Sequence, residues 1–259
     1  MQIDLLDVFA TGPLSGNPLA VVRGGEGLDT AAMQALTRWL GFSETTFLLP
    51  PVDPAADYRV RIFFPAGGVP REPGVVMQEC GVGLVPVRVE ADRLAFRAPP
   101  LRRAGPLDPA ERAGAIRLAG VAQSAVLRAV HADNGPPWVL LHCVSAEAVL
   151  AAAPLAKAEG PVNIGLIGPH GPGGSVDWEV RAFFNNPRGG IEEDPVTGSF
   201  NAAAAQYLFA AGLAAGGYVA AQGGRTGADG RVYVTQDQDG AAWIGGVVRM
   251  VAAGGAMAG

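Results

Sequence analysis

Apolar and polar residues alternate in many short stretches of this chain, which predicts a protein built mainly from strands. Helical periodicity is confined to residues 31–40, 108–118 and 146–153 and to one segment near residue 200. Many short strands with few helices indicate the α+β class and two antiparallel units. The predicted strands are residues 1–9, 19–22, 43–49, 58–64, 75–78, 84–89, 93–97, 124–130, 138–143, 164–167, 178–184, 218–221, 231–236, 242–244 and 247–251.

The segment around residue 200 has the most distinctive pattern. An acidic cluster that ends in Glu193 and Asp194 runs into a Pro-Val-Thr-Gly-Ser turn, and an Ala-rich apolar stretch, residues 200–209, follows directly. Ala, Leu and Gln favour helix, and a helix that is apolar nearly all round is a buried one. Thr197 and Ser199 are the candidate N-terminal caps of this predicted buried helix.

Two interpretations of this helix start follow from local physics. The first turn leaves backbone N–H groups without helical partners and carries partial positive charge, so it can hold a carboxylate or another anion. Asp194 and Glu193 beside it would then be available to handle protons. The other interpretation is a capped core helix whose acidic neighbours complement the helix dipole. Local physics alone leaves both open.

A proline-rich segment at residues 99–109 is the candidate linker between two domains. The predicted division is residues 1–103 and residues 108–246. The two halves resemble each other at one point, because residues 58–65 and 178–185 share an aromatic start, a central Arg and a Phe-Phe pair. A repeat this short is weak support for pseudo-symmetry.

Composition and charge exclude several classes of protein. The chain of 259 residues is 49% hydrophobic and 17% charged, which describes one large or two ordinary globular domains and excludes a disordered chain. The net charge is −5 and there is no basic run, so neither a nucleic-acid nor a membrane partner is expected. No apolar run reaches transmembrane length, and the N-terminus has a strand pattern, which together predict a cytoplasmic protein.

The cysteines and histidines do not form a metal-binding pattern. Cys80 and Cys143 lie far apart in the sequence, and His131, His142 and His170 lack ligand spacing. No metal site is therefore expected. The two thiols are expected to be reduced, as is usual in the cytoplasm.

Three segments, in this order, resemble signature segments of the PhzF-like phenazine-biosynthesis isomerases. They are residues 15–22 (Ser-Gly-Asn-Pro-Leu-Ala-Val-Val), 43–47 (Ser-Glu-Thr-Thr-Phe) and 193–199 (Glu-Asp-Pro-Val-Thr-Gly-Ser). The resemblance extends over essentially the whole chain. It implies the diaminopimelate-epimerase-like fold, in which two pseudo-symmetric domains are each a strand barrel around a central helix, with the active site in the cleft between them. It also implies that the last strand, within residues 247–259, returns to the first domain.

The resemblance also implies an activity and a site. The implied activity is a cofactor-independent isomerase that moves a proton within a small carboxylate-bearing, in some cases cyclic, substrate, with Glu44 as the catalytic acid and base. A homodimer is implied, and neither a metal nor an organic cofactor. An amino-acid epimerase or racemase of the same fold is an alternative, although neither cysteine lies on the loops that a thiol-based enzyme would need. The implied substrate-binding residues are Asn17, Asp194, Thr197, Gly198, Ser199 and Gly223.

The chain departs from the family pattern at one place. Relatives continue from the strand at residues 58–64 through a histidine-bearing segment into the central helix of the first barrel, whereas here Phe64-Pro65 is followed at once by Ala66-Gly67-Gly68. The first barrel is therefore predicted to be truncated, without that histidine and that helix. An unfilled interior of this size costs far more than an ordinary cavity. The departure counts against activity and favours a third alternative, a non-catalytic remnant that acts as a binding protein.

Overall fold

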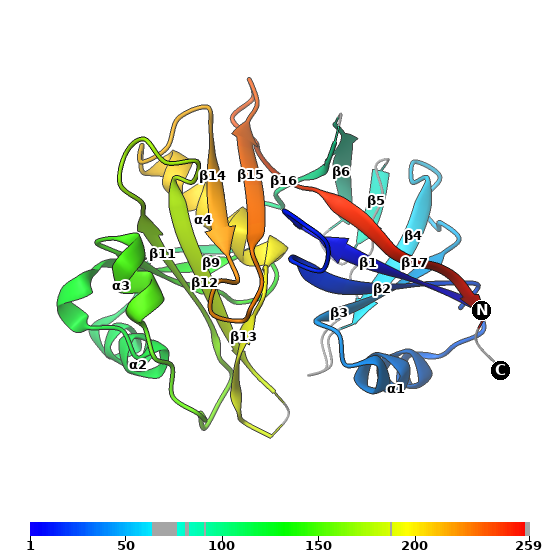
Figure 1. Ribbon diagram of the computed structural model, residues 1–259, viewed down its shortest axis with the longest axis horizontal. Helices are drawn as coiled ribbons and strands as arrows, with labels where there is room; N and C mark the ends of the chain where they lie inside the picture. The colour runs from blue at the N-terminus through cyan, green and yellow to red at the C-terminus, as the bar shows by residue number, and fades with distance from the viewer. Residues whose placement is uncertain (64–76, 81–82, 91, 187, 257–259) are drawn as a thin grey trace. The chain divides into compact units, whose positions relative to one another are not determined.

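The computed structural model describes residues 1–63, 77–80, 83–90, 92–186 and 188–256 (Figure 1). The chain forms two compact units. Unit 1 consists of residues 1–97 and 245–259, and unit 2 of residues 98–244. Each unit combines many short strands with few helices, so the predicted α+β class is confirmed.

Eight strands of the described residues form the sheet of unit 1, in the order β17-β1-β2-β3-β4-β5-β6-β7. Neighbouring strands are antiparallel except at β2–β3 and β4–β5, which are parallel. The last strand of the chain thus lies beside the first (Figure 1). The bounds are β1 (Gln2–Val8), β2 (Asn17–Arg23), β3 (Glu44–Leu49), β4 (Tyr58–Phe63), β5 (Met77–Cys80), β6 (Gly83–Val89), β7 (Leu94–Arg97) and β17 (Val248–Ala256).

Helix α1 (Thr30–Leu40) packs on one face of this sheet. Asp29 caps it, because its carboxylate accepts a hydrogen bond from the Ala32 N–H at 2.8 Å. Met33 is buried beneath the helix, and Leu36 packs at the margin of the same cluster. The apolar face that predicts this helix is therefore the face that the helix buries. The other buried members of the cluster are Val22, Phe47, Leu49 and Phe63.

Unit 2 repeats the arrangement of unit 1. Its strands follow the order β8-β9-β10-β11-β12-β14-β15, parallel at β10–β11 and β12–β14 and antiparallel elsewhere. The order and directions match those from β17 to β6, so the two units are pseudo-symmetric, and the short internal repeat of the sequence falls on the equivalent strands β4 and β12. The bounds are β8 (Arg103–Pro106), β9 (Val126–Asp133), β10 (Val139–Cys143), β11 (Asn163–Pro169), β12 (Trp178–Asn185), β13 (Ile191–Asp194), β14 (Gly217–Gln222), β15 (Gly230–Gln236) and β16 (Ala242–Gly246).

The helices of unit 2 lie on both faces of its sheet (Figure 1). Helices α2 (Pro109–Ala119) and α3 (Ala146–Ala151) cover a cluster of buried apolar side chains from β9 to β12. Helix α4 (Gly198–Ala210) packs on the other face and is buried nearly all round, as predicted. Its buried residues are Phe200, Asn201, Ala202, Ala203, Ala204, Ala205 and Leu208.

Gly165 of β11 allows α4 to approach the sheet closely. A Cβ atom at this position would lie 2.0 Å from Cζ of the Phe200 ring. The Phe200 ring also packs against Trp138, with ring centroids 5.3 Å apart. The absence of a side chain at residue 165 therefore sets where the first turn of α4 lies.

Three strands differ from the prediction, each because of pairing with a strand far away in the sequence. β8 lies inside the predicted linker and pairs with β9 despite its Gly and Pro residues. β13 occupies the acidic cluster, where no strand is predicted, and pairs with the second half of β12. β17 continues to Ala256, beyond the predicted end at residue 251, because it pairs with β1 as far as Gln2. A local pattern carries no information about such partners.

The predicted truncation of the first barrel lies at residues 64–76, outside the described residues. The neighbouring strands nevertheless define the length of chain available, since β4 ends at Phe63 and β5 begins at Met77. In unit 2 the equivalent strands are β12, which ends at Asn185, and β14, which begins at Gly217. That much longer interval contains both β13 and α4. The truncation stays a prediction, and the spacing of the strands favours it.

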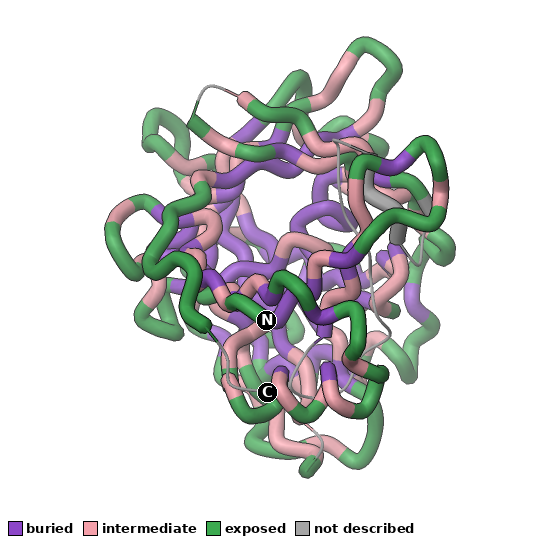
Figure 2. The backbone as a smooth tube through the Cα atoms, turned by 90° about the vertical axis from the view of Figure 1, so that its right-hand side faces the viewer, coloured by how far each residue is buried: buried purple, intermediate pink, exposed green. Residues whose placement is uncertain are grey.

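Buried residues lie mainly in the strands and in α4, although β8 and β17 are exposed along their whole length. Figure 2 colours the backbone by this burial and shows the outer loops of the tube mostly exposed. None of the helices in the described part of the chain has the length and apolar character needed to cross a bilayer.

Candidate active site

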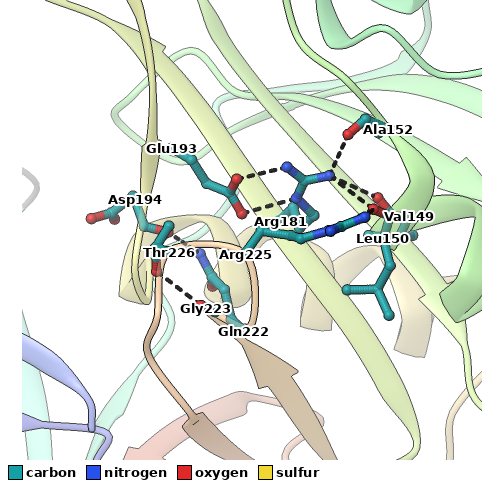
Figure 3. Close-up of polar contacts among 10 residues, drawn as sticks. All are labelled: Val149, Leu150, Ala152, Arg181, Glu193, Asp194, Gln222, Gly223, Arg225 and Thr226. Carbon is teal, nitrogen blue, oxygen red and sulfur yellow. Dashed lines mark hydrogen bonds and ion pairs between the residues drawn. The ribbon is translucent and has the colours of Figure 1, made fainter.

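The two acidic residues at the end of β13 have different surroundings. The carboxylate of Glu193 accepts hydrogen bonds from Nε and Nη2 of Arg181, at 2.9 and 2.7 Å. Arg181 also donates from Nη1 to the carbonyl oxygens of Val149 and Ala152 at the end of α3. Figure 3 shows Glu193 directed toward Arg181 and Asp194 directed away from it. Glu193 is therefore part of a largely buried ion pair, which counts against the interpretation that it handles protons.

Asp194 is held by a chain of hydrogen bonds within unit 2. Its carboxylate Oδ2 accepts a hydrogen bond from the Thr197 hydroxyl at 2.6 Å. Gln222 Nε2 donates to the same hydroxyl at 2.9 Å. It also donates to the Asp194 carbonyl oxygen at 3.1 Å (Figure 3). Because the Thr197 oxygen accepts from the amide, its own proton is free to point at Asp194. Asp194, which is 9% exposed, thus keeps a fixed orientation at the end of the strand.

The cap of α4 is not the one that the sequence suggests. Thr197 occupies the N-cap position, but its side chain makes no capping hydrogen bond, and Ser199 lies inside the first turn. Gln222 Oε1 accepts from the Thr197 N–H at 3.0 Å and from Asn201 Nδ2 at 2.9 Å, so it anchors the N-cap residue without capping the N–H groups of the first turn. The Thr197 hydroxyl instead donates to Asp194 and accepts from Gln222 Nε2. Thr197 and Ser199 are therefore wrong as side-chain caps.

Gly223 supports the segment 194–199, which we call the 194–199 loop, from the neighbouring hairpin. It follows β14 directly, with φ +105, a conformation that favours glycine. A Cβ atom here would lie 2.7 Å from the Pro195 carbonyl oxygen. Its own carbonyl oxygen accepts from the Thr226 N–H at 2.8 Å and from the Thr226 hydroxyl at 2.9 Å (Figure 3). β14 and β15 form an antiparallel hairpin, and Gly223 packs directly on the loop.

The start of α4 is partly accessible to solvent. Gly198 and Ser199 are partly exposed, whereas Thr197 is 6% exposed. The Ser199 hydroxyl oxygen accepts a hydrogen bond from the indole Nε1 of Trp138 at 3.1 Å. The first turn of a helix directs N–H groups outward, so a ligand at this place would meet backbone amides and one hydroxyl.

The two predicted site residues of unit 1 lie on adjacent parallel strands. Asn17 is the first residue of β2 and is buried, and Glu44 is the first residue of β3 and is partly exposed. Glu44 pairs in register with Leu19, two residues along β2 from Asn17. Side chains at alternate positions of a strand share a face, so all three side chains lie on one face of the sheet. Phe47, three residues further along β3, belongs to the buried cluster beneath α1. Residues three apart on a strand point to opposite faces, so Glu44 lies on the face away from α1.

An apolar row continues from Glu44 across the same face. Leu19 pairs with Leu6 of β1, and Leu6 pairs with Met250 of β17. Leu6 and Leu19 are partly exposed, and Met250 is 60% exposed. The carboxyl group of Glu44 therefore stands at one end of an accessible hydrocarbon surface.

In unit 2 the cysteine packs in the core, and each histidine side chain contacts a different polar partner. Cys143 is fully buried among apolar residues, and burial raises the pKa of its thiol to about 11, so it is not a thiolate at neutral pH. This counts against a thiol-based epimerase. In the described residues no three side chains of His, Cys, Asp or Glu gather as a metal site would need. The histidine pairs are His131 with Glu111, His142 with Tyr207, and His170 with Glu179.

Gln222 is the residue that sequence reasoning missed. It is 1% exposed and contacts Asp194, Thr197 and Asn201 through four hydrogen bonds. The only sequence signal is a glutamine directly before Gly223-Gly224 at the end of an apolar strand. A polar residue there is equally typical of a strand end, and only the contacts identify it.

Comparison with known proteins adds family information to this geometry. The chain matches the phenazine biosynthesis-like protein family, PhzC-PhzF, over residues 6–71 and 66–253. The two matched segments overlap at residues 66–71, close to the junction where the sequence is expected to depart from the family pattern.

Relatives with curated names include several isomerases. The chain is 57% identical over 61 residues to an uncharacterized isomerase of Mesorhizobium japonicum. It is 39% identical over 66 residues to the trans-2,3-dihydro-3-hydroxyanthranilate isomerase of Pseudomonas chlororaphis. These two matches span only 20% and 23% of the relatives' own length. A longer match, 30% identical and covering 78% of both chains, is to antisense-enhancing sequence 1 of Schizosaccharomyces pombe.

A solved structure supports the fold. A protein of Pseudomonas aeruginosa described as a predicted epimerase has a TM-score of 0.79 to this chain at 27% identity, covering 100% of this chain and 99% of that one. This likeness confirms the diaminopimelate-epimerase-like fold expected from the sequence. The names of the relatives support an isomerase as the class of enzyme.

Proposed function

This chain belongs to the phenazine biosynthesis-like family, and we propose that it is an isomerase that moves a proton within a small carboxylate-bearing substrate. The relative from Pseudomonas chlororaphis is named for trans-2,3-dihydro-3-hydroxyanthranilate, by its name a cyclic carboxylate. The observation that carries the proposal is the accessible start of α4, where oriented Asp194 adjoins Ser199 and backbone amides. The reaction uses no organic cofactor and no metal, and the chain acts as a homodimer, as the family resemblance implies.

Glu44 is the proposed acid and base. A carboxyl group can take a proton from one carbon of a substrate and return it to another, provided that it lies within hydrogen-bond reach of both. The apolar row formed by Leu19, Leu6 and Met250 beside it suits the hydrocarbon part of a substrate. Asn17, on the same sheet face, is proposed to contact the substrate as well.

The 194–199 loop is proposed to hold the substrate carboxylate. Gly198 and Ser199 would contact it directly, because they are the accessible residues at the positive end of the helix dipole. Asp194 would accept a hydrogen bond from a hydroxyl or amino group of the substrate. Thr197 and Gly223 would contribute indirectly, since one orients Asp194 and the other supports the loop.

Solvent-deuterium incorporation tests this proposal. Wild-type protein is incubated in D2O with trans-2,3-dihydro-3-hydroxyanthranilate and with a panel of small cyclic carboxylates, and deuterium at carbon is measured by mass spectrometry. Incorporation is expected in at least one compound. Glu44→Gln is expected to lower its rate by about 100-fold or more, because an amide cannot take the proton.

The matched control is Glu26→Gln, which makes the same change at an exposed position of unit 1 and is expected to keep the wild-type rate. A Glu44→Gln rate equal to wild type would reject Glu44 as the base. No incorporation in any compound would reject the isomerase and favour the non-catalytic remnant that the short interval at residues 64–76 suggests.

A second candidate is an epimerase of the same fold, favoured by the likeness to the predicted epimerase of Pseudomonas aeruginosa. This enzyme would remove a proton from a stereocentre beside a carboxylate and return it on the other face. The same deuterium assay, run on single enantiomers of α-amino and α-hydroxy acids, distinguishes the epimerase from the isomerase. Inversion together with labelling supports the epimerase, and labelling of an unsaturated ring compound supports the isomerase.

A further inference from the structure

The connection from β9 to β10, residues 134–138, reaches the proposed substrate site. Trp138 Nε1 donates to the Ser199 hydroxyl oxygen at 3.1 Å. Asn134 Nδ2 donates to the Ser199 carbonyl oxygen at 2.7 Å. Trp138 is 5% exposed and Asn134 is 2% exposed. Two buried donors from one connection thus converge on a single residue of the first turn of α4.

This connection holds its two side chains firmly. The N–H of Trp138 donates to the Pro136 carbonyl oxygen at 2.8 Å, and its own carbonyl oxygen accepts from the Ala132 N–H at 2.8 Å. The Trp138 ring packs against Phe200, the residue that follows Ser199. Consecutive prolines before Trp138 restrict the backbone further. The indole cannot leave Ser199 without losing its packing against Phe200 or moving this fixed backbone.

The direction of the hydrogen bond determines what Ser199 can offer a ligand. An indole N–H is only a donor, so the Ser199 oxygen must accept from Trp138. A hydroxyl has one proton and two lone pairs, and one lone pair is now used. Among the residues that the structure describes, no acceptor is bonded to the Ser199 proton. Because Ser199 is partly exposed, the proton is available to a ligand that arrives from solvent.

We propose that Trp138 and Asn134 are positioning residues that hold Ser199 as a hydrogen-bond donor for the substrate carboxylate. Asn134 anchors the backbone of the first turn, and Trp138 selects the orientation of the hydroxyl. A donor that is already oriented loses little freedom when the carboxylate binds, which strengthens binding. The inference rests on the proposed function of the 194–199 loop.

A double-mutant cycle tests the inference. Binding of anthranilate, a carboxylate probe that needs no turnover, is measured by calorimetry on the full chain for wild type, Trp138→Phe, Ser199→Ala and the double variant. Trp138→Phe keeps an aromatic ring but removes the N–H. Each single change is expected to weaken binding by about tenfold, as for loss of a hydrogen bond to a charged group. The double variant is expected to bind no more weakly than Ser199→Ala alone, because Trp138 acts through Ser199.

The matched control is Trp178→Phe, a buried tryptophan of the same unit that packs against His142. It is expected to change anthranilate binding less than about twofold. Additive losses in the cycle would overturn the inference, as would wild-type affinity in Trp138→Phe or no anthranilate binding by the wild-type chain. Coupled binding without deuterium incorporation would support the inference and reject the isomerase. Deuterium incorporation together with additive losses of binding would support the isomerase and reject the inference.

A second measurement covers the case in which Trp138→Phe does not fold. The indole N–H resonance of Trp138 is observed by NMR in wild type and in Ser199→Ala. Loss of the acceptor is expected to shift this resonance and to speed its exchange with solvent. An unmoved Trp138 resonance in folded Ser199→Ala would overturn the inference.

Discussion

At the scale of single residues, unit 2 is organised by buried polar side chains that satisfy one another. Gln222 joins the end of β13 to the start of α4, and Arg181 joins Glu193 to the last carbonyl groups of α3. Buried polar groups of this kind add little net stability while paired, but removing one partner leaves the others desolvated. Two predictions belong to this scale.

Replacing Gln222 by leucine is expected to destabilise the protein strongly. Leucine has a similar size but leaves the buried Thr197 N–H without its acceptor, the Thr197 hydroxyl without its donor, and Asn201 Nδ2 with only its bond to the Thr197 carbonyl oxygen. Each such group costs about 1–3 kcal/mol, so a loss of about 3 kcal/mol or more is expected in urea unfolding. Gln236→Leu, which removes one hydrogen bond to Gly240, is the matched control and is expected to cost about 0.5 kcal/mol. If Gln222→Leu lowered the free energy of unfolding no more than the control does, the argument that it leaves buried polar groups without partners would be wrong.

His142 is expected to make stability depend on pH. Burial, and then the positive charge of Arg128, lower the pKa of His142 below 6.5, and its Nδ1 lies 3.0 Å from the Tyr207 hydroxyl. The unfolded chain therefore binds a proton at a higher pH than the folded chain does. The free energy of unfolding should fall as pH drops below about 6.5, by up to about 1.4 kcal/mol per pH unit.

Urea unfolding of wild type and His142→Gln between about pH 7.5 and pH 5 measures this dependence. The variant lacks the titrating group, so its stability should change less over this range. Parallel curves for the two proteins would mean that His142 does not contribute.

At the scale of elements, the position of α4 decides the geometry of the candidate site. The helix begins at Gly198, and its first turn is fixed by Gln222 on one side and by the β9–β10 connection on the other. Its apolar character is evident in the sequence, because the alanine-rich pattern leaves no polar face. Which strand it approaches depends on Gly165, and a glycine within a strand pattern is equally typical of a bulge or a bend.

Gly165→Ala is expected to destabilise unit 2 through a clash with the Phe200 ring. The added Cβ would lie 2.0 Å from that ring, so the helix or the strand must move, at a cost of about 1–3 kcal/mol. Phe200→Leu in the same chain should recover part of the loss, which thermal unfolding of the single and double variants measures. Gly171→Ala, where a Cβ meets nothing within 4 Å, is the control. Independent effects of the two substitutions would contradict the packing argument.

At the scale of the whole molecule, the two units share the same order and directions of strands. The match of order and direction in the two units supports the pseudo-symmetry expected from the resemblance. The units differ after β4, because the interval from β4 to β5 is much shorter than the one from β12 to β14, which contains β13 and α4. The helix of unit 1 that packs on the cluster of Phe47 and Phe63 is α1, on the face away from Glu44.

Native-state hydrogen exchange is expected to distinguish the two units. A sheet covered by a buried helix opens less often than one without it, so amides of β2 and β3 should exchange faster than those of the equivalent β10 and β11. Mass spectrometry of proteolytic fragments from the labelled full chain measures this. Equal protection would mean that the face of unit 1 near Glu44 is covered by other means, and the prediction of a truncated barrel with an open interior would fail.

The sequence by itself determined the class of fold, the buried helix after residue 197 and the segments that carry the family resemblance. These features depend on the local period of apolar positions and on short motifs, both of which a chain displays without reference to its fold. The α1 cap at Asp29 and the hairpin of β14 and β15 are predictable for the same reason.

Only the tertiary structure decided which polar residues form the candidate site. Gln222 lies 25 residues from Thr197, and Trp138 lies 61 residues from Ser199, yet each pair is hydrogen-bonded. The pairing of Glu193 with Arg181, and of β13 with β12, likewise depends on partners that adjacent sequence does not specify. Hydrogen bonds are short-range and directional, so the role of a polar side chain is decided by what folding brings within about 3 Å of it.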